Sequence, residues 1–141
     1  MKEIRDLSGR GRVFLLGIFL LTLSCGGINQ APYGSNLTMP ESTTISSAVD
    51  VVFITKAVVV DKADNPLNAV DVDFTVCCDG AEFVDGNGGS LGPAITIRTD
   101  DSGVATANVL VYGNYAGSIL VTADIGTVTK QTTITKSVPA P

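Results

Sequence analysis

The sequence lacks histidine and tryptophan, and only 6% of its residues are aromatic. Without histidine there is no Ser-His-Asp or Cys-His catalytic arrangement, no His-based zinc site and no c-type haem attachment. The glycine-rich stretch 86–89 lacks the Gly-Lys-Ser/Thr ending of a phosphate loop. Asp71 and Asp73 alternate with valines, so we expect them on an open strand face, where carboxylates are solvated. We therefore predict that the protein is not an enzyme and has no catalytic residues.

Positive charge is also scarce, and much of it lies at the N-terminus. The chain has 9 Lys and Arg against 14 Asp and Glu, and Lys2, Arg5, Arg10 and Arg12 precede an apolar run at 13–23, VFLLGIFLLTL. A basic start followed by an apolar run of this length is typical of a secretory signal peptide. The run is shorter than the roughly 20 residues that a membrane-spanning helix needs. A buried helix is the alternative, but it leaves the basic flank unexplained.

The apolar run ends in Leu21-Thr22-Leu23-Ser24-Cys25, which resembles the lipobox of bacterial lipoproteins. The resemblance implies that residues 1–24 are removed, that the Cys25 thiol carries a diacylglycerol, and that the new amine is acylated. Ser24 matches the small residue of the pattern, and Thr22 stands where leucine is usual. Several acyl chains, each contributing about 0.8 kcal/mol per buried CH₂, hold a protein firmly on a membrane. Gly26, in place of a retaining aspartate, favours the outer membrane or the cell surface.

The chain that would remain after cleavage is strongly acidic. The leader holds two of the 14 acids and four of the nine bases, so twelve acids and five bases remain. Such a chain should repel nucleic acid and anionic membrane surfaces, because phosphate binding depends on Lys and Arg. We therefore expect no nucleic-acid partner, and a membrane link through covalent lipid.

The rest of the chain has the composition of a β-protein. Residues 25–42 are polar and contain Gly and Pro, which predicts a flexible tether, and 137–141 predict a tail. Between them, at 43–136, Val, Thr and Ile dominate and turn signals recur every eight to twelve residues, which favours an all-β sandwich or barrel. We expect 51–60 to be buried, because it is almost continuously apolar, and 127–136 to be an edge strand guarded by Lys130 and Lys136. The expected strands are 43–47, 51–60, 70–76, 81–84, 95–99, 105–111, 119–123 and 127–136.

The order of turns and strands resembles the bacterial Ig-like domain of group 1, the repeat of invasin and intimin. The resemblance covers roughly residues 43–136 and implies an Ig-like Greek-key β-sandwich of seven to eight strands with a spacer or adhesive role. Asp64 stands where that family usually has glycine, and a single domain leaves no room for a lectin-like tip. The matching turn residues are Asp61, Asn65, Pro66, Thr99, Asp100, Gly103, Ala105 and Gly117, and the matching strand residues are Val70, Val72, Phe74, Ala116, Ile119, Val121 and Ala123.

Cys77 and Cys78 are adjacent. Neighbouring residues of a strand point to opposite faces, so we expect one thiol in the core and the other in solvent. In an oxidising envelope three outcomes stay open: free thiols, a vicinal disulfide that would end the strand, or a bond to another subunit. Redox work by one of these thiols is a further hypothesis.

The segment 112–118 combines Tyr, Gly, Asn and Ser, the composition of adaptable binding loops. Leu110 and Leu120, on the outward sides of the flanking strands, would extend it into an apolar patch. The alternative is that the tyrosines cover the end of the sandwich. The candidate partner-binding residues are Leu110, Tyr112, Asn114, Tyr115 and Leu120.

Several loops carry oxygen ligands that suit Ca²⁺, although none has EF-hand spacing. Turn formation is the alternative role for the same residues, and we predict no other metal or cofactor. The weak calcium candidates are Asp61, Asp64, Asp85, Asp100 and Asp101.

Together these features predict a non-enzymatic, lipid-anchored envelope protein whose single Ig-like domain serves protein–protein interaction or a structural or adhesive role. One alternative is a carbohydrate-binding or adhesion module, stabilised by calcium. A second is a thiol-redox protein that uses Cys77 and Cys78.

Overall fold

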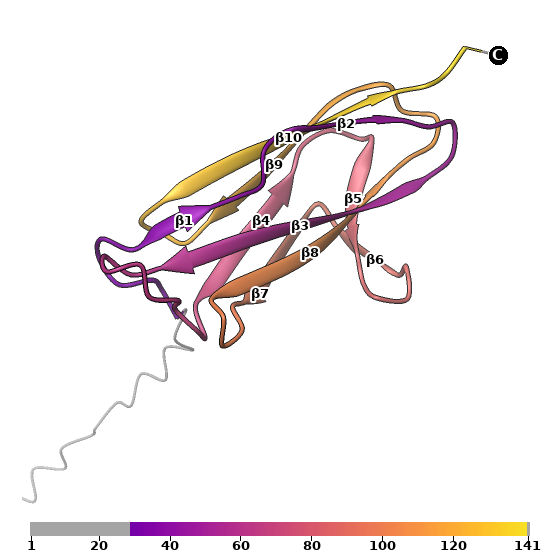
Figure 1. The fold of residues 1–141 in the computed structure, drawn as a ribbon. Helices are drawn as coiled ribbons and strands as arrows, with labels where there is room; N and C mark the ends of the chain where they lie inside the picture. Colours follow the sequence, from indigo (N-terminus) through magenta and orange to yellow (C-terminus); the bar gives the residue numbers. More distant parts are fainter. Residues whose placement is uncertain (1–28, 141) are drawn as a thin grey trace, which may run out of the picture.

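The computed structural model describes residues 29–140, so the expected signal peptide at 1–24 and the expected lipidation site Cys25 lie outside the described residues. Within these residues, ten strands form two five-stranded sheets that pack face to face (Figure 1), which confirms the expected Ig-like β-sandwich. All strand pairs are antiparallel except β2 with β10. The first sheet has the order β1 (Asn36–Thr38), β3 (Val51–Val60), β8 (Val104–Val111), β5 (Ala81–Val84) and β6 (Ser90–Gly92). The second has the order β2 (Thr43–Ser46), β10 (Thr129–Ser137), β9 (Gly117–Asp124), β4 (Asp71–Val76) and β7 (Ala94–Arg98).

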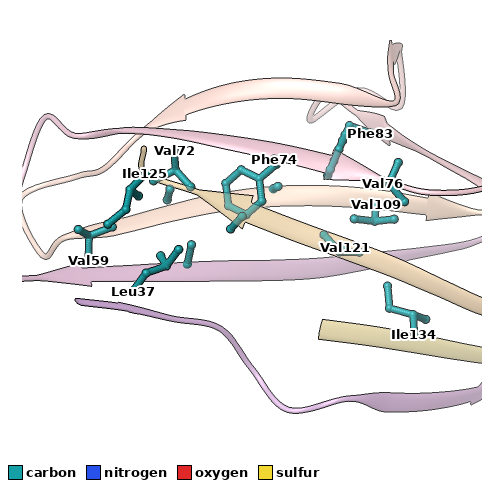
Figure 2. Packing of buried hydrophobic residues seen from close by; sticks show 14 of the residues in the cluster. Leu37, Val59, Val72, Phe74, Val76, Phe83, Val109, Val121, Ile125 and Ile134 are labelled. Atoms are coloured by element: carbon teal, nitrogen blue, oxygen red, sulfur yellow. The ribbon is translucent and has the colours of Figure 1, made fainter. Parts of the chain in front are cut away.

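The core lies between the sheets and follows the two-residue period of the strands. In β4, Val72, Phe74 and Val76 are buried, and the intervening Asp and Thr side chains face outward. The strands β8 and β9 alternate in the same way. Phe74 of one sheet and Phe83 of the other meet edge to face at the centre, with ring centroids 6.3 Å apart (Figure 2). The described residues, 29–140, contain no helix of the length and apolar character needed to cross a bilayer.

The domain begins earlier than the sequence predicts. Residues 36–38 form β1, which pairs with β3 through Asn36↔Val60. Leu37 is wholly buried, and Ala31 is 5% exposed. The prediction of a flexible tether over 25–42 is therefore wrong for residues 31–38. Apolar side chains among the Gly and Pro residues of this stretch pack onto the core. Strand β6, at 90–92, is likewise a strand that the sequence does not predict.

Two expectations about burial are wrong. Strand β3 is buried on one face only, and Val52 and Ile54 on the other face are 52% and 57% exposed, because no element within residues 29–140 covers this part of the first sheet's outer face. Strand β10 is not an edge strand along its second half, since residues 134–137 pair with β2 on one side and the strand pairs with β9 on the other. Its Lys136 is only 2% exposed and cannot guard an edge.

Candidate functional site

The β8–β9 loop, residues 112–116, carries the candidate binding residues and crosses from the first sheet to the second. The buried Lys136 of β10 holds it from beneath. The Lys136 Nζ atom donates to the carbonyl oxygens of Tyr112 at 2.9 Å, Gly113 at 2.7 Å and Tyr115 at 3.4 Å. A lysine ammonium has three donors and no acceptor, so these three carbonyls use its full capacity.

Contacts from two other segments also fix the backbone of the β8–β9 loop. The Gly113 N–H donates to Asp50 Oδ1 at 2.6 Å, and the Tyr112 N–H donates to the carbonyl of Gly80 at 3.0 Å. A Cβ at position 113 would lie 2.8 Å from the Ala48 carbonyl oxygen, so only glycine fits there. The loop is therefore held in one conformation by β10, by the β2–β3 connection and by the β4–β5 turn.

The two tyrosines of the loop are half-buried and Asn114 is exposed. The pKa of Tyr112 is raised, mainly by its hydrogen bond to Glu82, and further by burial and by the charges of Glu82 and Asp50. The Tyr115 ring lies where a side chain at Gly80 would be, and its hydroxyl donates to the Ser118 carbonyl at 3.3 Å. The tyrosines thus cover the end of the sandwich in part, while Asn114 points into solvent.

Leu110 and Leu120 do not form one patch with the loop. Strand β8 belongs to the first sheet and β9 to the second, so the outward sides of these strands are the two opposite faces of the sandwich. Leu110 pairs with the exposed Val52 of β3, whereas Leu120 pairs with Thr133 of β10. The expectation of a shared apolar surface is wrong because strands that follow each other along the chain belong here to different sheets.

Cys77 and Cys78 are joined by a vicinal disulfide directly after β4. Both residues are exposed, so the expectation of one thiol in the core is wrong. The positive φ of 77° at Cys78 turns the chain out of the strand. The Leu120 N–H donates to Cys77 Sγ at 3.2 Å, which holds the ring against β9. The disulfide is therefore part of the turn that carries Gly80 to the β8–β9 loop.

Three of the aspartates considered for calcium form the same kind of turn. Each accepts backbone N–H groups from the residues two and four positions ahead: Asp61 from Ala63 and Asn65, Asp85 from Asn87 and Gly89, and Asp100 from Ser102 and Val104. Such bonds are the usual use of Asp in turns. Among residues 29–140, no group of three or more Cys, Asp or Glu side chains is placed to hold a metal ion, and calcium binding stays a prediction.

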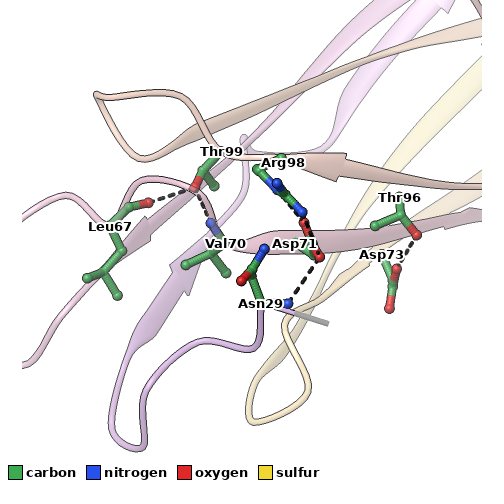
Figure 3. Close-up of polar contacts among 8 residues, drawn as sticks. All are labelled: Asn29, Leu67, Val70, Asp71, Asp73, Thr96, Arg98 and Thr99. Carbon is green, nitrogen blue, oxygen red and sulfur yellow. Dashed lines mark hydrogen bonds and ion pairs between the residues drawn. The ribbon is translucent and has the colours of Figure 1, made fainter. Parts of the chain in front are cut away.

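The family turn residues also have structural roles. The hydroxyl of Thr99 donates to the Leu67 carbonyl at 2.7 Å and accepts the Val70 N–H at 3.0 Å (Figure 3). Gly103 has a positive φ of 72°, and a Cβ there would lie 2.6 Å from the Val59 carbonyl oxygen. These residues therefore join the β3–β4 and β7–β8 turns, and no ligand is needed to explain them.

The aspartate turns predict a loss of stability in acid. Hydrogen bonds from Asn65, and then from Ala63, lower the pKa of Asp61, and bonds from Gly89 and Asn87 lower that of Asp85. A lowered folded-state pKa gives stability that is present above the unfolded value, about 3.9, and is lost as pH falls through the folded value. We expect the melting temperature to decrease as the pH drops below about 4. The Asp61→Asn variant should show a smaller decrease than the wild type.

Asp64→Asn is the matched control for this prediction. Asp64 belongs to the same turn but contributes its backbone N–H, which donates to the Asp61 carbonyl at 3.2 Å, and asparagine tolerates its φ of 63°. Equal pH profiles for Asp61→Asn and the wild type in thermal unfolding would contradict the assignment.

A groove of about 450 Å³ lies between the first sheet and the edge strand β7. The sequence does not predict it, because its walls come from strands of both sheets. Its lining combines apolar side chains with polar ones, namely Val84, Leu91, Ile95 and Ile97 with Asp85, Thr96, Thr106 and Asn108. It is a second surface at which a partner could bind.

The sequence matches no protein-family model, and no curated protein matches it in sequence. Its fold is similar to part of Escherichia coli alpha-2-macroglobulin, with a TM-score of 0.53, 15% identity and coverage of 82% of this chain and 7% of that one. It is also similar to domains 4 and 5 of the S-layer protein SbsC, with a TM-score of 0.46, 16% identity and coverage of 72% and 50%. A third similar structure is a ScaB type I cohesin from Pseudobacteroides cellulosolvens, with a TM-score of 0.48, 12% identity and coverage of 76% of this chain and 94% of that one. The chain thus spans half of the SbsC fragment and a small part of the macroglobulin, and the likeness shows the fold alone.

Proposed function

We propose that this protein is a non-enzymatic, lipid-anchored protein of the bacterial envelope that binds a protein partner through the β8–β9 loop. The observation that carries the proposal is the hold of buried Lys136 on three carbonyls of that loop. A loop that is already ordered loses less conformational entropy on binding. Asn114, with the partly exposed Tyr112 and Tyr115, supplies the polar and aromatic groups that are common in binding loops.

The sequence supports the envelope location and the anchor. Cys25 follows a signal-like segment and stands in a lipobox-like pattern. The fold, and the turns built by Asp61, Thr99 and Gly103, support membership of bacterial Ig-like group 1. Gly26 favours the outer membrane or the cell surface over the inner membrane.

Site-specific photo-crosslinking in intact cells tests the binding surface. With a photoreactive residue in place of Asn114, we expect one recurring protein adduct, identified by mass spectrometry. Gln131, exposed in β10 and not part of the groove lining, is the matched control and should give no such adduct. A recurring adduct only from position 96, beside the groove, would move the site there. Scattered neighbours from every position would contradict partner binding and favour a spacer.

A further inference from the structure

The chain joins the domain at a fixed point. The Asn29 carbonyl accepts the Asp71 N–H at 2.9 Å, and the Asn29 N–H donates to Asp71 Oδ2 at 3.1 Å. Arg98 holds the other oxygen of the Asp71 carboxylate at 2.9 Å (Figure 3). Two residues further along, Ala31 is buried in the core. Residue 29 is therefore attached to the domain, at the start of β4.

This attachment lies at one end of the sandwich, which we call the anchor end. The β3–β4, β7–β8 and β9–β10 connections lie there, and the β8–β9 loop lies at the opposite end, the far end (Figure 1). The ten residues of β3 run from the far end to the anchor end. At about 3.4 Å per residue, they separate the two ends by roughly 34 Å.

Only three residues separate Cys25 from Asn29. Four peptide steps reach at most about 14 Å. A free tether over the 18 positions 25–42, as the sequence predicts, would reach about 60 Å. A lipid on Cys25 would therefore keep the anchor end close to the headgroups.

The anchor end also carries groups that suit a headgroup layer. Tyr33 is 89% exposed, and the Lys62 Nζ atom lies 5.1 Å from the centroid of its ring. Tyrosine and lysine have apolar bodies and polar tips, and both are favoured at the boundary between headgroups and acyl chains. Asp61, Asp64 and Asp100 at the same end disfavour anionic lipid, so the surface that fits is a zwitterionic bilayer.

We infer that the lipidated protein stands on a zwitterionic bilayer with its anchor end, including Tyr33, against the headgroups and its β8–β9 loop directed away from the membrane. The inference rests on the proposed lipidation of Cys25. It deepens the proposed function, because it places the binding loop about 34 Å from the lipid surface, where a partner reaches it without touching the bilayer.

Fluorescence quenching on vesicles tests this orientation. The full lipidated chain, with its Cys77–Cys78 disulfide intact, is labelled at Ser102→Cys on the anchor end or at Asn114→Cys on the far end. Both are reconstituted in phosphatidylcholine–phosphatidylethanolamine vesicles that contain a headgroup-linked quencher. We expect quenching at position 102 to be several-fold stronger than at position 114. Equal quenching at both positions would overturn the inference.

A third label, at Thr106→Cys, separates an upright domain from one that lies flat. Thr106 is exposed on the outside of the first sheet, near Ile54. Stronger quenching at 106 than at 102 would mean that this face lies on the membrane and would overturn the inference. The lipidation of Cys25 is tested separately, by intact mass and by flotation with vesicles. A chain that carries no acyl groups, or that does not float with the vesicles, would overturn both the lipidation and the orientation.

Discussion

Replacing Phe74 by alanine is expected to destabilise the domain by about 3–5 kcal/mol, the usual range for a buried phenylalanine. Phe74 is wholly buried at the centre of the core and meets Phe83 of the opposite sheet edge to face. The substitution removes one of the central contacts between the two sheets and leaves a cavity. Equilibrium unfolding in denaturant measures the change.

Phe53→Ala is the control for this prediction, since Phe53 in β3 is only partly buried against the same core. Its loss should cost clearly less than that of Phe74. If the two variants unfold at the same denaturant concentration, the core is not centred on Phe74 as described.

Replacing Lys136 by methionine is expected to cost about 1–3 kcal/mol, the range for leaving a buried acceptor without a partner. Methionine is of similar length but cannot donate to the Gly113 carbonyl, which Lys136 contacts at 2.7 Å. The loss should be concentrated in the β8–β9 loop. We therefore expect faster amide exchange at Gly113 and Tyr115, together with a lower free energy of unfolding.

Lys130→Met is the matched control, because Lys130 lies in the same strand and is exposed. A surface substitution of this kind usually changes stability by less than about 0.5 kcal/mol. Equal effects of the two methionine variants would show that Lys136 does not hold the loop.

The sequence predicts the inward faces of β4, β8 and β9 because strict alternation of apolar and polar residues is a local property. It does not predict which outer faces stay uncovered. By composition, Val52 and Ile54 belong to an apolar run that predicts burial. Their exposure depends on whether another element packs over the first sheet, which the segment itself does not encode. Strand β1 is also missed, because three residues with one buried leucine give too short a pattern.

The position of β10 shows how non-local pairing limits sequence inference. Its edge-strand interpretation fails at residues 134–137 because β2, more than eighty residues earlier, pairs with them in parallel. Lys136 is in phase with the buried Thr132 and Ile134, and this phase is the signal that could have placed it inside. Lysine side chains are usually exposed, and this general rule predicts the opposite of what the alternation indicates for Lys136. The composition of the β8–β9 loop thus indicates a binding loop, but the sequence does not predict that Lys136 fixes the backbone of that loop.

The most direct test is the photo-crosslinking yield from position 114 in intact cells, compared between the otherwise wild-type chain and the chains carrying Lys136→Met or Lys130→Met at equal protein levels. If a fixed β8–β9 loop is the binding surface, one recurring protein adduct forms in the wild-type and Lys130→Met backgrounds and is much weaker with Lys136→Met. An adduct of equal yield in all three backgrounds, or no recurring adduct at position 114, would contradict the account.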